Sequence, residues 1–156
     1  MDGRIKSGHD SVDETDRFDY FRTGPKAAAA IMKIKKYYLI FAFCIVSIIA
    51  LLYGVSPYWF ARTFLEVPQL DANLAHILRA VMGLYIGLGL FWLFAAFSDS
   101  YRNTAVLTTA IFSGGLVSGR LISLFADGRP STLLILYFFM ELVLIPIAFW
   151  VFRLPE

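Results

Sequence analysis

The nineteen residues from Tyr37 to Val55 read YYLIFAFCIVSIIALLYGV and contain no charged side chain. A helix rises about 1.5 Å per residue, so about 20 apolar residues cross the hydrocarbon core of a bilayer. The run ends at the turn-forming sequence Gly54–Pro57, and 36 residues precede it. Because the run is longer than the apolar part of a signal peptide and lies far from the first residue, we interpret it as a membrane-spanning signal anchor.

Three further apolar stretches follow, and each contains a single charged residue; they are residues 79–97, 105–125 and 132–152. Backbone polar groups inside a bilayer must be bonded within the segment, so each stretch is expected to be a helix. Asp71 or Asn73 is placed to cap the second helix, and Ser131 or Thr132 to cap the fourth. The predicted fold is an all-α integral membrane protein, with a four-helix bundle over residues 37–156.

The composition excludes several other classes of protein. Hydrophobic residues make up 58% of the chain and charged residues 17%. Soluble domains contain about 45–50% apolar residues and roughly 25% charged residues. A short chain keeps much of its surface in water, so this composition excludes a soluble globule. It also excludes a disordered chain, and the single cysteine, Cys44, excludes a disulfide-stapled secreted domain.

The charges divide the chain into an N-terminal arm and a membrane domain. Residues 1–36, the arm, carry eight basic and six acidic side chains, whereas residues 37–156 carry six of each sign. Lysines and arginines in short segments beside a span remain in the cytoplasm. Because the arm is basic next to the first span and the number of spans is even, we expect both termini to be cytoplasmic.

The arm itself has two parts. Residues 10–22 are acidic and carry three interleaved aromatic side chains: Phe18, Tyr20 and Phe21. This part is expected either to be disordered or to order on a partner protein as a docking segment. Residues 26–36 are basic, so we expect them to lie on anionic lipid head groups and to extend the first span as a helix from Pro25.

The charged residues within the spans all fall in the non-cytoplasmic half of the bilayer. On the expected topology Arg79 lies at the surface, Arg120 about 8 Å below it and Glu141 about 15 Å below it. A lone carboxylate at that depth costs at least about 2.5–3.5 kcal/mol, so it should be paired, protonated or beside water. A long arginine side chain can cross the difference in depth. We therefore predict an Arg120–Glu141 ion pair inside the bundle, with Arg79 joining from above.

The sequence leaves two roles for this pair open. In the first, the pair only locks the third span to the fourth. In the second, it lines an outward-opening pocket for a proton, an anionic head group or a polar solute. His76 and Tyr137 are further candidates for this pocket, because His76 lies one turn before Arg79 and Tyr137 one turn before Glu141. The stripe of the third span that carries Arg120 holds other polar side chains: Thr109, Ser113, Ser123 and Asp127.

Two pairs of glycines match the small-xxx-small motif of membrane helices. Gly83 and Gly87 lie in the second span, and Gly115 and Gly119 in the third. Such residues let helices approach closely, so we expect the second span to pack on the third through them. Homodimerisation or docking to a larger complex through these faces is the alternative.

No cofactor site is predicted. Cys44 is the only cysteine, and His9 and His76 are the only histidines, so no cluster has the spacing of metal ligands. Nucleotide-binding, nucleophile-elbow and zinc-protease motifs are also missing from the sequence. We expect no metal, no other cofactor and no nucleic-acid partner. Most tyrosines and tryptophans, including Tyr53 and Trp92, fall near predicted interfaces and are interpreted as an aromatic belt.

Several motifs occur in order along residues 45–152: Leu52-Tyr53-Gly54, Leu78-Arg79-Ala80-Val81-Met82-Gly83-Leu84-Tyr85, Ser118-Gly119-Arg120-Leu121, Asp127-Gly128-Arg129-Pro130 and Glu141-Leu142. With these motifs the chain resembles an uncharacterised bacterial family of four-span inner-membrane proteins, known only as a domain of unknown function. The resemblance implies the four-helix fold and a location in the bacterial inner membrane. It implies no activity, and it does not cover the arm.

These features together favour a small non-catalytic membrane protein. We expect an accessory or assembly subunit of a larger inner-membrane complex, with membrane lipids and other membrane subunits as partners. The alternative is a carrier or binding protein for a lipid, a quinone or a polar solute, using Arg79, Arg120 and Glu141. A membrane enzyme ranks third, since only Glu141 and His76 could serve as acid or base.

Overall fold

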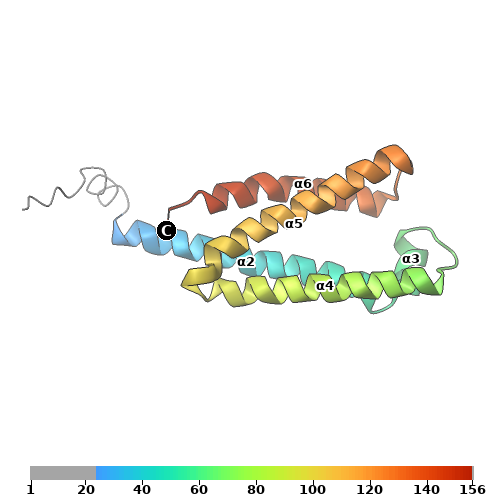
Figure 1. Ribbon diagram of the computed structural model, residues 1–156, viewed down its shortest axis with the longest axis horizontal. Coiled ribbons are helices and arrows are strands. Elements are labelled where there is room, and N and C mark those ends of the chain that lie inside the picture. Colours follow the sequence, from blue (N-terminus) through green and yellow to red (C-terminus); the bar gives the residue numbers. More distant parts are fainter. Residues whose placement is uncertain (1–23, 156) are drawn as a thin grey trace, which may run out of the picture.

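The computed structural model describes residues 24–155, which form five helices (Figure 1): α2 (Pro25–Gly54), α3 (Pro57–Phe64), α4 (Ala72–Ala96), α5 (Asp99–Ala126) and α6 (Thr132–Phe152). Helices α2, α4, α5 and α6 are each long and apolar enough to cross a membrane. The chain is therefore a multi-pass membrane protein built as an all-α bundle of four spans, as the sequence predicts. The aromatic residues Phe18, Tyr20 and Phe21 of the arm lie outside the described residues.

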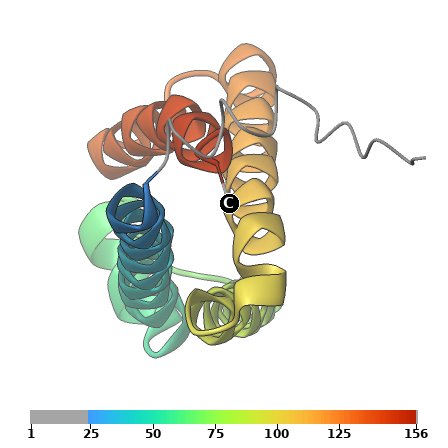
Figure 2. The same cartoon turned by 90° about the vertical axis from the view of Figure 1, so that its left-hand side faces the viewer.

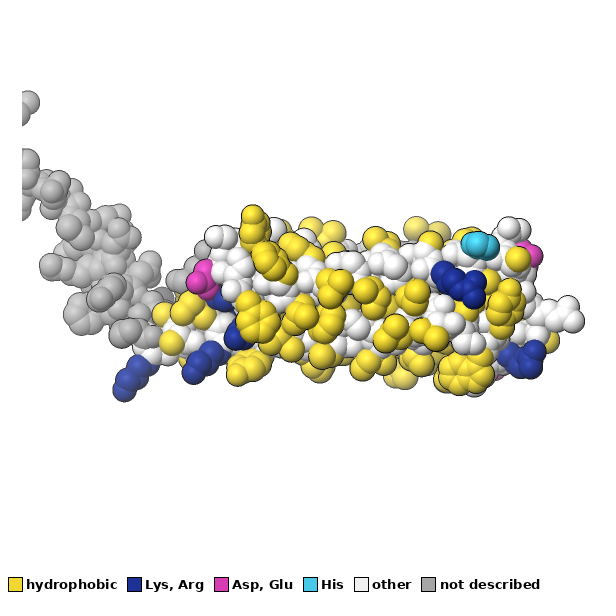
Figure 3. Space-filling model, turned by 90° about the horizontal axis from the view of Figure 1, so that it is seen from below, with side chains coloured by type: hydrophobic (Ala, Val, Ile, Leu, Met, Phe, Trp, Pro, Cys, Tyr) yellow, Lys and Arg dark blue, Asp and Glu magenta, His cyan; other side chains and the backbone are white. Residues whose placement is uncertain are grey.

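The outside of the bundle is apolar along its length. Figure 3 shows hydrophobic side chains between two ends that carry the lysines and arginines of that face. Large apolar side chains on every span point outward, among them Phe41, Leu84, Ile111 and Val143, each more than half exposed. In a bilayer these side chains contact lipid, so their exposure fits a membrane-embedded body.

The helix ends follow the capping signals in part. Helix α2 begins at Pro25 as predicted, with proline in the first turn. Asp71 caps α4, because its Oδ2 accepts a hydrogen bond from the backbone N–H of Asn73 at 3.3 Å. Ser131 occupies the N-cap position of α6, but its hydroxyl makes no capping bond and is buried with no hydrogen-bond partner among residues 24–155.

The short helix α3 was not predicted. Pro57 signals a turn, but a proline is also well suited to the first position of a helix. Phe60 of α3 is only 2% exposed, and its ring centroid lies 5.1 Å from that of Tyr53 on α2. Helix α3 therefore covers one end of α2 and α4, which we call the α3 end.

The four spans are arranged as two closely packed pairs. Helix α2 packs most extensively on α4, and α5 on α6 (Figures 1 and 2). A Cβ added to Gly89 of α4 would lie 2.9 Å from Val46 Cγ1 on α2, and one added to Gly54 would overlap Met82. These two glycines are therefore the ones that let α2 and α4 approach closely.

The predicted packing through the two glycine motifs is wrong. Gly83, Gly87, Gly115 and Gly119 are all exposed, and a Cβ added to any of them meets open space. The face of α4 that enters the bundle instead carries Tyr85, Gly89 and Trp92. Exposed glycines are tolerated on a span because the helix satisfies its own backbone bonds in lipid.

Gly89→Ala is expected to lower the free energy of unfolding by about 1–3 kcal/mol, because the added methyl group overpacks the contact with Val46. Gly87→Ala is the matched control, and we expect it to raise stability by up to about 1 kcal/mol through helix propensity alone. Unfolding in mixed detergent micelles, followed by circular dichroism, measures both. Equal losses for the two variants would contradict the assigned helix faces.

The opposite end of the bundle, which we call the turn end, is closed tightly. Only Phe97 and Ser98 separate α4 from α5, and the Ser98 N–H donates to the carbonyl of Ala95 at 3.1 Å. Arg102 Nη2 donates to the carbonyl of Ala96 at 3.3 Å. Lys35 of α2 is 3% exposed and donates to Asn103 of α5 at 3.0 Å. These bonds fix α2, α4 and α5 to one another at this end.

Candidate functional site

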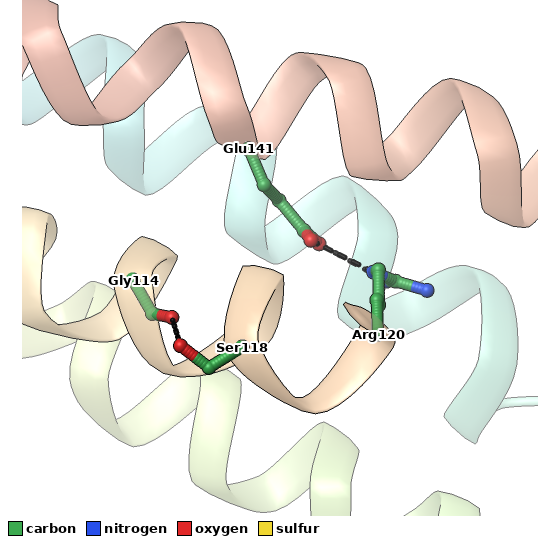
Figure 4. A network of polar contacts seen from close by, with 4 residues as sticks. All are labelled: Gly114, Ser118, Arg120 and Glu141. Atoms are coloured by element: carbon green, nitrogen blue, oxygen red, sulfur yellow. Dashed lines mark hydrogen bonds and ion pairs between the residues drawn. The ribbon is translucent and has the colours of Figure 1, made fainter. Parts of the chain in front are cut away.

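Arg120 of α5 and Glu141 of α6 form the predicted ion pair (Figure 4). Arg120 Nε donates to Glu141 Oε2 at 2.7 Å, and Arg120 Nη2 donates to Oε1 at 3.0 Å. The Glu141 side chain is 6% exposed and the Arg120 side chain 22%. Paired bonds from one guanidinium to both carboxylate oxygens fix the orientation of both groups. The pair also removes the cost of a lone carboxylate inside the membrane.

The local sequence explains why the two side chains meet although their helix positions differ in depth. Arg120 lies six residues before the end of α5, and Glu141 lies in the middle of α6. Figure 4 shows the Glu141 side chain slanting from α6 towards α5, and the Arg120 side chain rising from α5 to meet it. Ser118 on the same helix does not join the pair, because its hydroxyl donates to the carbonyl of Gly114 at 2.8 Å.

Three tyrosines lie around the ion pair: Tyr53, Tyr85 and Tyr137. Together with Arg120 and Glu141 they form what we call the charged cluster. The Arg120 Cζ lies 5.8 Å from the centroid of the Tyr137 ring, within cation–π distance. The rings of Tyr53 and Tyr85 pack edge to face at 5.9 Å, and both side chains lie within electrostatic range of Arg120. All three tyrosines are buried. Each of the four spans therefore contributes to the cluster.

The aromatic-belt interpretation is wrong for three side chains of the bundle: Tyr38, Tyr53 and Trp92. Tyr53 is 8% exposed and Trp92 is 3% exposed. Trp92 Nε1 donates to Thr108 Oγ1 at 3.0 Å, and the Tyr38 hydroxyl is hydrogen-bonded to Thr109 at 2.7 Å. A tyrosine or tryptophan can face the bundle interior instead of the lipid interface when its O–H or N–H group has a hydrogen-bond partner there. The motifs of the family resemblance, which include Tyr53 and Tyr85, are the signal that could have identified the tyrosines of the cluster.

Arg79 and His76 are not part of the charged cluster. Both are exposed on α4, on the same side as Gly83. Arg79 lies six residues before Tyr85, which places it about 120° around the helix from that inward-facing side chain. The expectation that Arg79 joins the ion pair is therefore not met.

A pocket lies between α5 and α6 where their connecting loop begins; we call it the α5–α6 pocket. Its volume is about 380 Å³, and Arg120 and Arg129 are its charged lining residues. Its apolar walls include Leu134, Ile135, Phe138 and Phe139. Ile135 is 41% exposed and Phe139 57% exposed, so this side of the pocket faces the surrounding lipid.

A second, smaller cavity lies inside the bundle, and we call it the inner cavity. Its volume is about 40 Å³, room for one or a few water molecules. Its polar lining residues come from α2, α4, α5 and α6: Tyr38, Tyr85, Trp92, Thr109, Ser113 and Glu141. Arg120 lines the α5–α6 pocket but not the inner cavity, and Glu141 lines the inner cavity but not the pocket. The ion pair therefore lies between the two compartments.

The polar stripe predicted on α5 divides at Arg120. Thr109 and Ser113 are buried in the bundle. Ser123 and Asp127 are exposed beyond it, and the Ser123 hydroxyl donates to Asp127 Oδ2 at 2.6 Å. The last part of α5 thus projects past the packed core and forms one wall of the α5–α6 pocket.

Residues 34–152 match the family model described as Domain of unknown function (DUF4345), which is well over half of the chain. The chain belongs to the DUF4345 family. The matched DUF4345 region contains the whole charged cluster and both cavities, and most of the arm lies outside it. No curated protein and no solved structure matches the chain.

Within residues 24–155 of this DUF4345 protein, no group of three or more His, Cys, Asp or Glu side chains could hold a metal ion. Cys44 is exposed on the lipid side of α2. The chemistry that the described residues can provide is therefore centred on the guanidinium groups of Arg120 and Arg129 and on the Glu141 carboxylate.

Proposed function

We propose that the protein is a non-catalytic binding protein for anionic membrane lipids, and that the α5–α6 pocket takes the lipid head group. The observation that carries this proposal is the position of Arg120 and Arg129 in a pocket with apolar walls that face lipid. A guanidinium presents a planar set of donors that matches a phosphate group. The pocket volume of about 380 Å³ also lies in the usual range for small-molecule sites.

The remaining donors of Arg120 support this assignment. Its Nε and Nη2 face Glu141, whereas no bond from Nη1 to a described residue is seen. Nη1 can therefore donate to a head-group oxygen in the pocket. Phe138 and Phe139 lie beside the acyl chains in this arrangement, where aromatic and aliphatic groups pack favourably.

The charge of the pocket favours an anionic over a zwitterionic lipid. Glu141 balances the charge of Arg120, and Arg129 adds a positive charge to the pocket lining, whereas Asp127 is exposed and is not a lining residue. A monoanionic head group such as that of phosphatidylglycerol balances this charge, whereas phosphatidylcholine brings a cation with its phosphate.

Arg129→Gln is expected to weaken binding of phosphatidylglycerol about tenfold to hundredfold, the effect of losing one charge-assisted hydrogen bond. The matched control is Arg62→Gln, which removes an exposed arginine of α3 at the same end of the bundle. Native mass spectrometry of the full chain, with phosphatidylglycerol and phosphatidylcholine in competition, measures the preference. Equal binding of the two lipids, or equal effects of the two variants, would reject the proposal.

Inorganic phosphate separates a lipid site from a site for free phosphate. We expect millimolar phosphate to leave bound phosphatidylglycerol in place, because phosphate lacks the acyl chains that contact Phe138 and Phe139. Displacement of the lipid by phosphate alone would show that the pocket recognises a soluble anion.

A second candidate function is that of an accessory subunit of a larger membrane complex. The open faces at Gly83, Gly87, Gly115 and Gly119 support it, because a helix of another protein can approach closely there. The aromatic residues Phe18, Tyr20 and Phe21 of the arm are the proposed docking segment. Co-purification in mild detergent tests this candidate: a stoichiometric complex that is lost on deletion of residues 1–24 supports it, and an isolated monomer rejects it.

We also propose a location in the bacterial inner membrane with both termini in the cytoplasm. The start of α2 and the end of α6 lie at the same end of the bundle (Figure 1). Among residues 24–155, that end carries six basic residues, and the α3 end carries three exposed arginines: Arg62, Arg79 and Arg129. This difference supports a cytoplasmic turn end. Reporter fusions to both termini test the orientation.

A further inference from the structure

We propose that the α5–α6 pocket selects anionic phospholipids whose head groups carry an alcohol hydroxyl, and that Ser123 is the residue that determines this specificity. The inference rests on the proposed lipid binding and names the class of head group that the same pocket takes. It starts from the hydrogen bond between Ser123 and Asp127, two residues around the end of α5.

The first step concerns the position of Ser123. Together with Arg120 and Leu124 it forms the part of the pocket wall that α5 contributes, since residues three and four positions apart share one face of a helix. Ser123 lies three residues closer to the end of α5 than Arg120, a rise of about 4.5 Å. The acyl chains of a bound lipid point into the bilayer, so the part of the head group beyond the phosphate points the other way, towards Ser123.

The second step concerns the hydrogen of the Ser123 hydroxyl. Ser123 Oγ donates it to Asp127 Oδ2 at 2.6 Å. A serine hydroxyl has one hydrogen and two lone pairs, so towards the pocket Ser123 acts as an acceptor. The guanidinium groups of Arg120 and Arg129, which also line the pocket, act only as donors. A hydroxyl that already donates to a carboxylate is also a stronger acceptor.

The third step matches this arrangement to a ligand. Phosphate oxygens accept bonds from the two guanidinium groups, and a donor placed a few bonds beyond the phosphorus reaches Ser123 Oγ. The glycerol hydroxyls of phosphatidylglycerol are such donors, whereas a head group without a donor leaves Ser123 Oγ to water. An ammonium group also donates, but the positive charge of Arg129 in the same pocket disfavours it. The pocket therefore fits an anionic head group with an alcohol hydroxyl.

The test compares two lipids that differ only in their hydroxyl groups. Phosphatidylpropanol has the charge, the acyl chains and the head-group carbon atoms of phosphatidylglycerol but neither of its hydroxyls. Native mass spectrometry of the full chain, with the two lipids in competition, gives the ratio of their affinities. For Ser123→Ala we expect the preference for phosphatidylglycerol to fall about threefold to tenfold, the effect of losing one uncharged hydrogen bond. The affinity for phosphatidylpropanol should stay the same, because this lipid makes no bond to Ser123.

Ser118→Ala is the matched control. Ser118 is exposed on the same helix, its hydroxyl donates to the carbonyl of Gly114, and it does not line the pocket. We expect this variant to keep the ratio of the wild type. Arg129→Gln should weaken both lipids by the same factor, because both carry the phosphate that Arg129 binds.

Two results would overturn the inference and leave lipid binding intact: an unchanged ratio in Ser123→Ala, and an equal fall of the ratio in Ser118→Ala. Failure of both lipids to bind the wild type would overturn the proposed function and this inference together. Binding of both lipids that is insensitive to Arg129→Gln would do the same, since it would place the lipids outside the α5–α6 pocket.

Discussion

Arg120→Gln is expected to lower the free energy of unfolding by about 3–5 kcal/mol, the cost of leaving one member of a buried ion pair alone. The reason is the position of Glu141, whose side chain is 6% exposed and has Arg120 as its ionic partner. Glutamine is too short and carries no charge, so the carboxylate loses both of its bonds. Unfolding of the full chain in mixed micelles measures the loss.

The double variant Arg120→Gln with Glu141→Gln shows whether the loss comes from the pair. We expect it to recover much of the stability lost in Arg120→Gln, because no uncompensated charge stays in the bundle. Glu141→Gln alone should cost less than Arg120→Gln, since the guanidinium faces the α5–α6 pocket. A double variant less stable than either single variant would mean that the two side chains act independently.

Trp92→Ala is expected to lower the free energy of unfolding by about 3 kcal/mol, at the lower end of the range for truncating a large buried aromatic side chain. Lipid is as apolar as the bundle interior, so the loss comes from packing and from the cavity rather than from transfer out of water. The variant also removes the bond to Thr108 and the edge-to-face contact with Phe112 at 5.6 Å.

Trp150→Ala is the control for Trp92→Ala. Trp150 is 59% exposed on α6 and contacts lipid, so we expect its removal to change stability by less than about 1 kcal/mol. The same micelle unfolding experiment compares the two variants. Similar losses would show that Trp92 lies in an aromatic belt, as the sequence suggested, and not in the bundle.

The sequence was sufficient to predict both the spans and the ion pair, because the bilayer constrains both. A bilayer requires long apolar stretches, so their number and ends can be read directly from the chain. It also makes an isolated charge costly, so two opposite charges deep within the spans were expected to pair. Arg120 and Glu141 were the two that lay deepest, and the structure brings them together.

The sequence could not show which face of each helix enters the bundle. In a soluble protein the inward face is apolar and the outward face polar, but in a bilayer both faces are apolar. The glycine motif at Gly83 and Gly87 was therefore assigned to the interior, although Gly89 on the opposite side makes the close contact. Tyr53 was missed for the same reason, since an aromatic residue near a helix end fits a lipid interface or a bundle core equally well. Tyr85 lies in the middle of α4, where an aromatic side chain can face either lipid or the bundle interior.

The two-residue connection between α4 and α5 determines how the bundle can open. At the turn end, Phe97 and Ser98 and the bond from Lys35 to Asn103 hold three helices in place, whereas at the other end longer loops join the spans. Separation of the α2–α4 pair from the α5–α6 pair is therefore expected to hinge at the turn end and to widen the α3 end. The inner cavity lies between the two pairs, so this separation would open it towards the α3 end, whereas the walls of the α5–α6 pocket belong to one pair and would move as a unit.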